Sequence, residues 1–386
     1  MRIASPDSAQ RNALIRLRQV LHAAPEVSGA ERATAATICD FLRTSAPDGV
    51  VDGLGGHGLA VIYDSDRPGP TVMFRAELDA LPITETGTSA HVSRNPGIAH
   101  LCGHDGHMAI LAGLGLWLGA NRPARGRVTL LFQPAEETGT GARAVLADPR
   151  FAALRPDWAF ALHNMPGLPL GALAVAAGPA SCASVGLRLH LGGREAHAAM
   201  PETGRSPAPA LAAFMAGLSA HTIPAPMGPD FRLATLCHLR LGAPAFGIAP
   251  GEAEAFVTLR SCTDNALEGF EAEIRALAQD CAKGLDLSIT RHDHFNATEN
   301  DPLAAAHVAS AGHRLGMERA EFTFPMRASE DFGAFSATTR TALLFLGAGV
   351  AQPALHNPDF DFPDALIAPG CALFAEILRQ INGPQG

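Results

Sequence analysis

The run Cys-Gly-His-Asp-Gly-His at residues 102–107 places one thiol and two imidazoles within six positions. Cys102, His104 and His107 are two or three residues apart, a spacing at which a thiolate and imidazoles can bind one metal ion. Gly103 allows the tight backbone path that such convergence needs. Histidines in turns are often simply solvated, so the run alone does not distinguish a metal site from a polar turn.

Two adjacent carboxylates, Glu136 and Glu137, follow a predicted buried strand at residues 127–132. Adjacent acids usually indicate exposed surface charge. Here Pro134 precedes them and Thr-Gly-Thr-Gly follows at 138–141, where the backbone can come close to another group. One carboxylate can bind a metal while its neighbour acts as general base on a water molecule.

Two further histidines, His163 and His356, lie at the end of a predicted strand and before an Asn-Pro-Asp-Phe-Asp-Phe run, respectively. Either histidine alone is more often a structural residue. Together with Cys102, His104 and Glu137 they offer five sulfur, nitrogen and oxygen ligands on loops where strands end. This combination predicts a metal centre.

The hydrophobic pattern predicts an α/β scaffold for these side chains. Residues 9–23 and 31–42 have apolar residues at helical spacing. Predicted strands span 59–63, 71–75, 127–132, 157–162 and 342–346, and a closing helix spans 369–381. Polar residues follow these strands repeatedly, at the edge where open α/β sheets bind ligands. We therefore expect a catalytic domain with a central, mostly parallel sheet flanked by helices.

A different pattern begins near Ser181. Predicted strands at 184–191, 233–241 and 253–260 alternate with predicted helices at 207–220 and 267–285. A β-α-β-β-α-β order of this kind predicts a smaller α+β sandwich inserted into the larger domain. We expect residues 1–180 and 294–386 to form the catalytic domain and residues 181–293 to form a dimerisation or lid domain.

Length and composition are consistent with this organisation. A chain of 386 residues exceeds what one hydrophobic core usually serves. The net charge of −9 argues against a nucleic-acid partner, because phosphate neutralisation needs a basic face. No secretory signal or membrane-length apolar segment is evident, so we expect no membrane association. Seven scattered cysteines favour the reducing cytoplasm over a disulfide framework.

Seven sequence runs resemble the dinuclear metalloamidohydrolases, the family of aminoacylases and glutamate-releasing carboxypeptidases. The runs are FRAELDALPI (74–83), CGHDGH (102–107), QPAEETGTGA (133–142), ALHN (161–164), GREAHAAMP (193–201), SEDF (329–332) and LHNPDFDF (355–362). They are most similar to the branch of hippurate hydrolases, N-acyl-amino-acid amidohydrolases and auxin-conjugate hydrolases. The resemblance covers nearly the whole chain.

The resemblance implies a role for each matching residue. Two divalent metal ions per subunit would be bound by Cys102, His104, Glu137, His163 and His356, with Cys102 as the bridge. Glu136 would be the general base, and Asp79 would orient a metal ligand. His107 has no role in the resemblance and is expected to pack against or cap the following helix. A thiolate ligand favours Zn²⁺, whereas the resemblance points to Mn²⁺, Co²⁺ or Ni²⁺.

Two residues of the inserted domain are candidates for contacts with the substrate. The resemblance implies that His197 reaches the active site of a partner subunit and stabilises the oxyanion, which requires a homodimer or a dimer of dimers. Arg260 could bind the α-carboxylate of the substrate, since a guanidinium fork matches a carboxylate. A surface ion pair is the alternative for Arg260.

The sequence departs from the family pattern in three places. The N-terminal His-x-His-Pro-Glu motif appears here as residues 22–26, which lack the second histidine, and Glu77 stands where the branch often has aspartate. Gly247 stands where an asparagine usually helps to bind substrate. Because all five predicted ligands are present, we expect catalysis to persist with altered substrate choice.

The predicted function is metal-dependent hydrolysis of the amide bond of a small-molecule N-acyl-amino acid, with Glu136 as base. One alternative is a metal-free cysteine amidase in which Cys102 pairs with His104 or His107. Others are an aminopeptidase or carboxypeptidase acting on short peptides, and a non-catalytic protein that binds a metal or a peptide. A base retained beside a metal ligand argues against the non-catalytic alternative.

Overall fold

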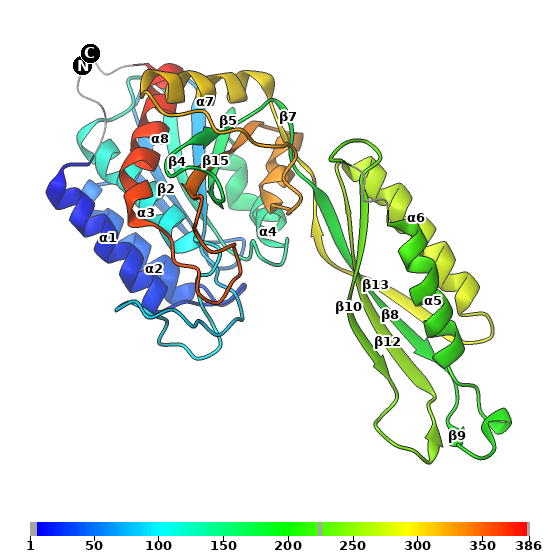
Figure 1. The fold of residues 1–386 in the computed structure, drawn as a ribbon. Coiled ribbons are helices and arrows are strands. Elements are labelled where there is room, and N and C mark those ends of the chain that lie inside the picture. The colour runs from blue at the N-terminus through cyan, green and yellow to red at the C-terminus, as the bar shows by residue number, and fades with distance from the viewer. Residues whose placement is uncertain (1–5, 223–225, 384–386) are drawn as a thin grey trace. The chain divides into compact units, whose positions relative to one another are not determined.

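A computed structural model describes residues 6–222 and 226–383 (Figure 1). The chain divides into a larger unit, Met1–Ala180 with Thr298–Phe322 and Asp331–Gly386, and a smaller unit, Ser181–Ala297 with Thr323–Glu330. The predicted boundaries assign residues 323–330 to the catalytic domain, whereas the structure groups them with the smaller unit. The reason is local pairing, because the Cys182 N–H donates to the carbonyl oxygens of Met326 and Ala328 at 3.0 and 3.2 Å.

The larger unit is built on a seven-stranded sheet with the order β1-β2-β4-β3-β5-β15-β6. The strands are β1 (Gly49–Leu54), β2 (Gly58–Asp64), β3 (Thr71–Glu77), β4 (Arg127–Gln133), β5 (Trp158–Pro166), β6 (Leu173–Ala174) and β15 (Arg340–Gly349). The central strands β4, β3, β5 and β15 run parallel, and antiparallel strands extend both edges. Nearly all residues of β3 and β4 are buried, as expected for parallel strands covered on both faces.

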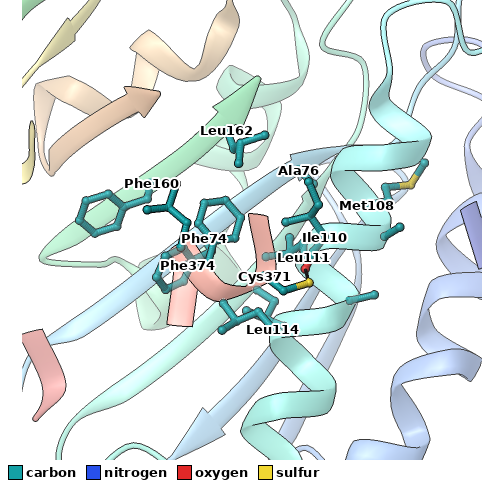
Figure 2. Packing of buried hydrophobic residues seen from close by; sticks show 14 of the residues in the cluster. Phe74, Ala76, Met108, Ile110, Leu111, Leu114, Phe160, Leu162, Cys371 and Phe374 are labelled. Atoms are coloured by element: carbon teal, nitrogen blue, oxygen red, sulfur yellow. Dashed lines mark hydrogen bonds between the residues drawn. The ribbon is translucent and has the colours of Figure 1, made fainter. Parts of the chain in front are cut away.

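Helices cover this sheet and enclose its core. They are α1 (Ser8–Ala23), α2 (Arg32–Leu42), α3 (His104–Ala120), α4 (Gly141–Ala147), α7 (Pro302–Arg314) and α8 (Ile367–Asn382). α3 is apolar around its circumference because it packs against α1, α8 and β3. The ring of Phe74 packs against those of Phe160 and Phe374, with centroids 5.6 and 4.8 Å away. Figure 2 labels these rings in the core. Truncating such a ring to alanine costs about 3–5 kcal/mol.

The smaller unit is a four-stranded antiparallel sheet with the order β10-β12-β8-β13 and two helices. Its elements are β8 (Ala183–Gly192), β9 (Ala196–His197), α5 (Ala208–His221), β10 (Arg232–Leu241), β11 (Ile248–Ala249), β12 (Glu252–Ser261), α6 (Asp264–Cys281) and β13 (Asp286–Phe295). Alternate residues of β8 are buried in the core that this sheet shares with α5 and α6. The predicted fold class, an α/β domain with an inserted α+β sandwich, is confirmed.

Short elements complete the fold. β7 (Gly178–Ser181) pairs with β14 (Thr298–Asn300), and β9 pairs with β11. The 3₁₀ helices span Arg43–Ser45, Pro149–Leu154, Pro201–Thr203, Asp331–Ala337 and Asp364–Leu366. Within the described ranges, no helix has the length and apolar character needed to cross a membrane.

Candidate metal centre

The carboxyl-terminal edge of the central parallel strands carries the predicted site residues. β3 ends just before Asp79, β4 ends just before Glu136, and β5 carries His163 close to its end. The first turn of α3 carries His104, and the loop after β15 carries His356. Side chains far apart in the sequence thus meet at one sheet edge, as expected for an open α/β fold.

The five predicted ligands lie together in two overlapping groups. The ligand atoms of Cys102, His104 and His163 lie within 4.8 Å of one another, and so do those of Cys102, Glu137 and His356. Cys102 belongs to both groups, which is the arrangement that a bridging ligand requires.

Distances between the predicted ligand atoms match those expected of atoms that share a cation. Cys102 Sγ lies 3.4 Å from His163 Nε2. Glu137 Oε1 lies 3.8 Å from His104 Nε2 and 3.7 Å from His356 Nε2. Atoms bound at about 2.0–2.3 Å to one ion lie roughly 3–4 Å from each other. One thiolate, three imidazoles and one carboxylate form a donor set suited to divalent transition metals.

A hydrogen bond to the backbone fixes the orientation of the His104 ring. Its Nδ1 donates a hydrogen bond to the backbone carbonyl of Asp79 at 2.8 Å, so the Nε2 lone pair points away from that bond. His104 is fully buried, and its Nε2 has no hydrogen-bond partner among the described residues. A buried nitrogen of this kind is costly unless another group satisfies it, and a cation would do so.

His163 is held in the same way. Its Nδ1 donates to the carbonyl oxygen of Asn164 at 2.7 Å, which leaves Nε2 facing Cys102. The Asn164 side chain in turn donates to the carbonyl of Cys102 at 2.8 Å. Gly103 has φ +92°, and a Cβ there would lie 2.3 Å from Asn164 Oδ1, so only glycine fits between Cys102 and His104.

The charges at the site favour a cation. Burial alone would lower the pKa of His104, but the carboxylates of Glu77, Glu137 and Asp79 raise it to about 9. These carboxylates therefore stabilise a positive charge at His104, whether a proton or a metal ion carries it. Burial, reinforced by the nearby His107, lowers the pKa of His163 to about 3. His163 is thus a neutral imidazole, the form that binds metals.

Asp79 and Ser28 support the Glu137 backbone. Asp79 Oδ2 accepts hydrogen bonds from the Glu137 N–H at 2.9 Å and from the Ser28 hydroxyl at 2.7 Å. Asp79 therefore touches one predicted ligand with its carboxylate and another, His104, with its carbonyl. This kind of role is the one predicted for Asp79 from the sequence, whereas no sequence motif indicates Ser28.

Glu31 supports the turn that precedes the two carboxylates. Glu31 is fully buried, and its Oε1 accepts the N–H groups of Ala135 and Gly29, each at 2.8 Å. Ala135 has φ +51°, a left-handed conformation that costs a non-glycine residue about 1–2 kcal/mol. This role of Glu31 was not predicted from the sequence. Its spacing from Ser28, S-x-x-E, normally indicates a helix cap, so that signal would have misassigned the side chain.

A layer of buried charges lies behind the centre. Arg75 contacts Glu77, and its Nη2 lies 2.7 Å from Asp331 Oδ1. Asp331 also accepts the side-chain amide of Gln133 at 2.8 Å. His107 Nδ1 lies 2.7 Å from Glu77 Oε2, and its Nε2 accepts the Asn164 N–H at 3.1 Å. Both nitrogens of His107 thus have hydrogen-bond partners, Glu77 and the Asn164 N–H, that are not among the five predicted ligands.

Comparison with known proteins identifies the family. Residues 73–380 match the sequence profile of peptidase family M20/M25/M40. The chain belongs to this family. An N-acetyldiaminopimelate deacetylase of Listeria monocytogenes is 28% identical over 353 residues, covering 90% of this chain and 93% of that protein. The M20 assignment confirms the predicted family, and the protein is an amidohydrolase.

Solved M20-like structures share the fold. A dinuclear metal-binding M20 peptidase from Bacillus subtilis has a TM-score of 0.81 at 24% identity, covering 98% of this chain and all of that one. An aminobenzoyl-glutamate utilization protein from Klebsiella pneumoniae has a TM-score of 0.72 at 20% identity, covering 96% of each chain. At these identities the likeness establishes the architecture only.

The structure shows one imidazole that faces the thiol of Cys102. The imidazole that faces Cys102 Sγ at 3.4 Å belongs to His163, not to His104 or His107. With its pKa lowered to about 3 by burial, His163 is a weak proton acceptor at neutral pH. The Cys102–His163 pair is therefore poorly suited to activate the Cys102 thiol as a nucleophile.

His197 lies on β9 of the smaller unit and is exposed. Its Nδ1 accepts the N–H of Ala199 at 3.0 Å, so Nε2 carries the proton and is a donor. Gly247, the position where the family pattern has asparagine, accepts the Ala198 N–H at 3.0 Å. A Cβ at Gly247 would have no atom within 4 Å, so a side chain could be accommodated there.

Arg260 lies on β12 of the smaller unit. Its Nη1 donates to the Ser329 hydroxyl at 2.8 Å. No carboxylate of the described residues is among the charged neighbours of Arg260, so the surface ion pair considered as an alternative is not present there. Burial lowers the pKa of Arg260, as expected for a guanidinium without an anionic partner.

Proposed function

We propose that this M20 amidohydrolase hydrolyses the amide bond of N-acyl-amino acids at a centre of two divalent metal ions. Two overlapping groups of donor atoms that share Cys102, with Glu136 beside them, are the observation that carries this proposal. The Bacillus subtilis structure is described as dinuclear, and the Listeria relative is named as a deacetylase of an N-acetylated amino acid.

The metal ions would be held by the five predicted ligands, Cys102, His104, Glu137, His163 and His356. Divalent metals in such a site lower the pKa of water towards neutrality and polarise the amide carbonyl. Zn²⁺ suits the thiolate, and Mn²⁺, Co²⁺ and Ni²⁺ suit the imidazoles and the carboxylate.

Glu136 is the proposed general base. Its carboxylate is 6% exposed, and its Oε2 lies 3.9 Å from His104 Nε2, beside the predicted ligands. Glu136 removes the proton from the attacking water and delivers it to the leaving amine, so a carboxylic acid and a free amino acid result. Glu137 is then a ligand and Glu136 the proton carrier, which explains why the two acids are adjacent.

Two side chains of the smaller unit complete the proposed reaction. The Nε2–H of His197 would stabilise the tetrahedral oxyanion that forms in the active site of the partner subunit. One such donor contributes roughly 3–4 kcal/mol of transition-state stabilisation in comparable sites. Arg260, which has no carboxylate partner among the described residues, would bind the α-carboxylate of the substrate. The smaller unit is thus proposed as a dimerisation or lid domain, and the enzyme as a homodimer or a dimer of dimers.

The substrate class follows from the named relative and from the resemblance. We expect N-acetyl- and N-benzoyl-amino acids, the latter being hippurate-like, to be hydrolysed. Short peptides are the alternative within the same chemistry. The seven cysteines are free thiols, which suits the cytoplasm as the proposed location.

Two glutamate variants test the mechanism together. Glu136→Gln should keep two metal equivalents and lose turnover, whereas Glu137→Gln should lose metal and turnover together. Metal content is measured on the purified protein, and turnover on a panel of N-acetyl- and N-benzoyl-amino acids. Wild-type turnover by Glu136→Gln would overturn the mechanism, and activity that survives chelation but not thiol alkylation would support the cysteine amidase.

A further inference from the structure

A buried cluster of charges lies next to the metal centre, in the larger unit, and the proposed mechanism does not use it. The Arg18 cluster consists of Arg18, His22, Glu85, His91, Asp105, Asp361 and Asp364. Arg18 is 1% exposed, and it is among the largest fully buried side chains of the described residues. A buried guanidinium is tolerated only where carboxylates surround it.

Arg18 contacts carboxylates from two segments that carry predicted ligands. Its Nη1 lies 2.6 Å from Asp361 Oδ1 and 3.3 Å from Asp105 Oδ2, and its Nε lies 2.7 Å from Asp364 Oδ1. Asp105 directly follows His104, whereas Asp361 and Asp364 follow His356 in the loop after β15.

His22 strengthens the side of the cluster that faces α3. Its Nδ1 lies 2.9 Å from Asp105 Oδ2, and its Nε2 lies 3.1 Å from Glu85 Oε1. Because both ring nitrogens face carboxylates, both carry protons, and the ring is an imidazolium. The first histidine of the incomplete His-x-His-Pro-Glu motif therefore belongs to this charge cluster.

The loop that carries His356 depends on such external contacts. Between the end of β15 and the short helix at Asp364 the chain has no regular secondary structure. His356 has φ +66° and its side chain is 49% exposed, so the path of its backbone decides where the imidazole points. The His356 N–H donates to the Leu101 carbonyl at 2.8 Å, and the Phe362 ring fills the space beside Gly106, where a Cβ would clash at 2.3 Å.

We propose that Arg18 is a positioning residue of the metal centre, which sets the location of His356 relative to His104 by binding Asp361 and Asp105 with the same guanidinium nitrogen. This inference rests on the proposed metal function. A planar guanidinium can contact carboxylates along several edges at once, whereas a lysine ammonium is a point charge. Arg18→Lys therefore keeps the charge and loses the geometry.

A purely structural role is the competing explanation, since breaking a buried ion cluster costs about 3–5 kcal/mol wherever it lies. The two explanations differ in what happens to the metals. A structural role predicts a lower melting temperature with two metal equivalents still bound normally. A positioning role predicts selective weakening of the equivalent that depends on His356.

The experiment compares Arg18→Lys with His356→Ala by titrating the metal-free proteins with Co²⁺, following the visible absorption and the heat released. We expect His356→Ala to lose one equivalent, and Arg18→Lys to bind that equivalent about 10–100-fold more weakly while binding the other normally. Arg127→Lys is the matched control. This substitution replaces a guanidinium whose Nε donates to Asp64 Oδ2 at 2.8 Å, away from the metal centre. The variant should titrate as wild type.

Each outcome has one meaning. If His356→Ala loses an equivalent and Arg18→Lys binds both normally, the positioning role is overturned and the proposed function stands. If His356→Ala also binds both normally, the proposed ligand set fails. Should Arg18→Lys not fold, Asp361→Asn answers the question, because Asp361 is 37% exposed and faces Arg18 from the His356 side. If Asp361→Asn binds both metal equivalents as tightly as wild type, the inference is overturned.

Discussion

The carboxylate of Asp79 accepts the backbone N–H of Glu137 at 2.9 Å, although the two residues are 58 positions apart. The carbonyl of Asp79 also accepts His104 Nδ1 at 2.8 Å. One residue just after β3 therefore positions both a carboxylate ligand and an imidazole ligand of the proposed centre. Supports of this kind commonly matter almost as much as the ligands themselves.

Replacing Asp79 with alanine should weaken metal binding without removing a ligand. Asp79→Ala removes the acceptor for the Glu137 N–H but keeps the carbonyl that holds His104, so we expect about 10–100-fold lower metal affinity. Activity should return at high metal concentration. Asp40→Ala, at an exposed position in the same unit, is the control. Unchanged metal affinity in Asp79→Ala would contradict the assignment.

Replacing Glu31 with alanine should destabilise the turn before Glu136. Glu31→Ala removes the acceptor for the N–H groups of Ala135 and Gly29, and each such hydrogen bond contributes about 0.5–1.5 kcal/mol. We expect a lower melting temperature and a reduced kcat. Glu31→Gln keeps one accepting oxygen and should retain most of both. Equal stability and turnover in all three proteins would rule out this role.

The stability of the fold should decline as pH rises from about 6.5 to about 9 because of His22. Burial alone would lower the pKa of His22, but Asp105 and Glu85 raise it from 6.5 to about 9. Below pH 6.5 the folded and unfolded states both bind the proton, so the stabilisation is complete. It decreases as the unfolded state loses its proton and vanishes above about pH 9.

Melting temperatures of wild type and His22→Gln between pH 6 and 10 test this dependence. The wild-type melting temperature should fall across the interval, and the variant should show a shallower fall from a lower starting value. Parallel curves would mean that His22 does not carry the dependence.

Removing the metals should lower stability as well as activity. A ligand present at 100 times its Kd stabilises the folded state by about 2.7 kcal/mol. Chelation should therefore reduce the melting temperature of wild type and leave that of metal-free Glu137→Gln unchanged. Adding Mn²⁺, Co²⁺ or Zn²⁺ should restore both properties. A wild-type melting temperature that does not change on chelation would argue against a metal centre.

Mixing two inactive variants should recover activity if subunits share His197. His197→Ala should keep its metals and lose turnover, and Glu137→Gln should retain His197 without a metal centre. In a dimer reassembled at random, half of the molecules are mixed and contain one complete site, so about a quarter of wild-type activity is expected. No recovery after reassembly would place His197 and the metals of one site in the same subunit.

The sheet edge was predictable from sequence because strand ends and metal ligands leave local signals. Apolar runs of β-strand length precede Asp79, Glu136 and His163, and parallel strands bring their carboxyl ends together. Short motifs in a fixed order therefore predict the family and the fold class from the sequence alone.

The Arg18 cluster was not predictable because its members come from separate motifs and nothing in the sequence links them to Arg18. Arg18 and Asp361 are 343 positions apart, and charged residues on a helix or in a loop ordinarily indicate solvent exposure. The assignment of Thr323–Glu330 to the smaller unit was missed for a similar reason. It depends on the backbone bonds of Cys182, which no pattern of side chains reveals.

The division of the chain has a consequence for protein engineering. The path crosses between the two units after Ala180, Ala297, Phe322 and Glu330. A chimera that exchanges only residues 181–297 with those of another M20 enzyme would separate Arg260 from its own Ser329. A graft that keeps the Arg260–Ser329 contact must therefore transplant residues 323–330 as well, so it has to exchange two separate segments of the gene.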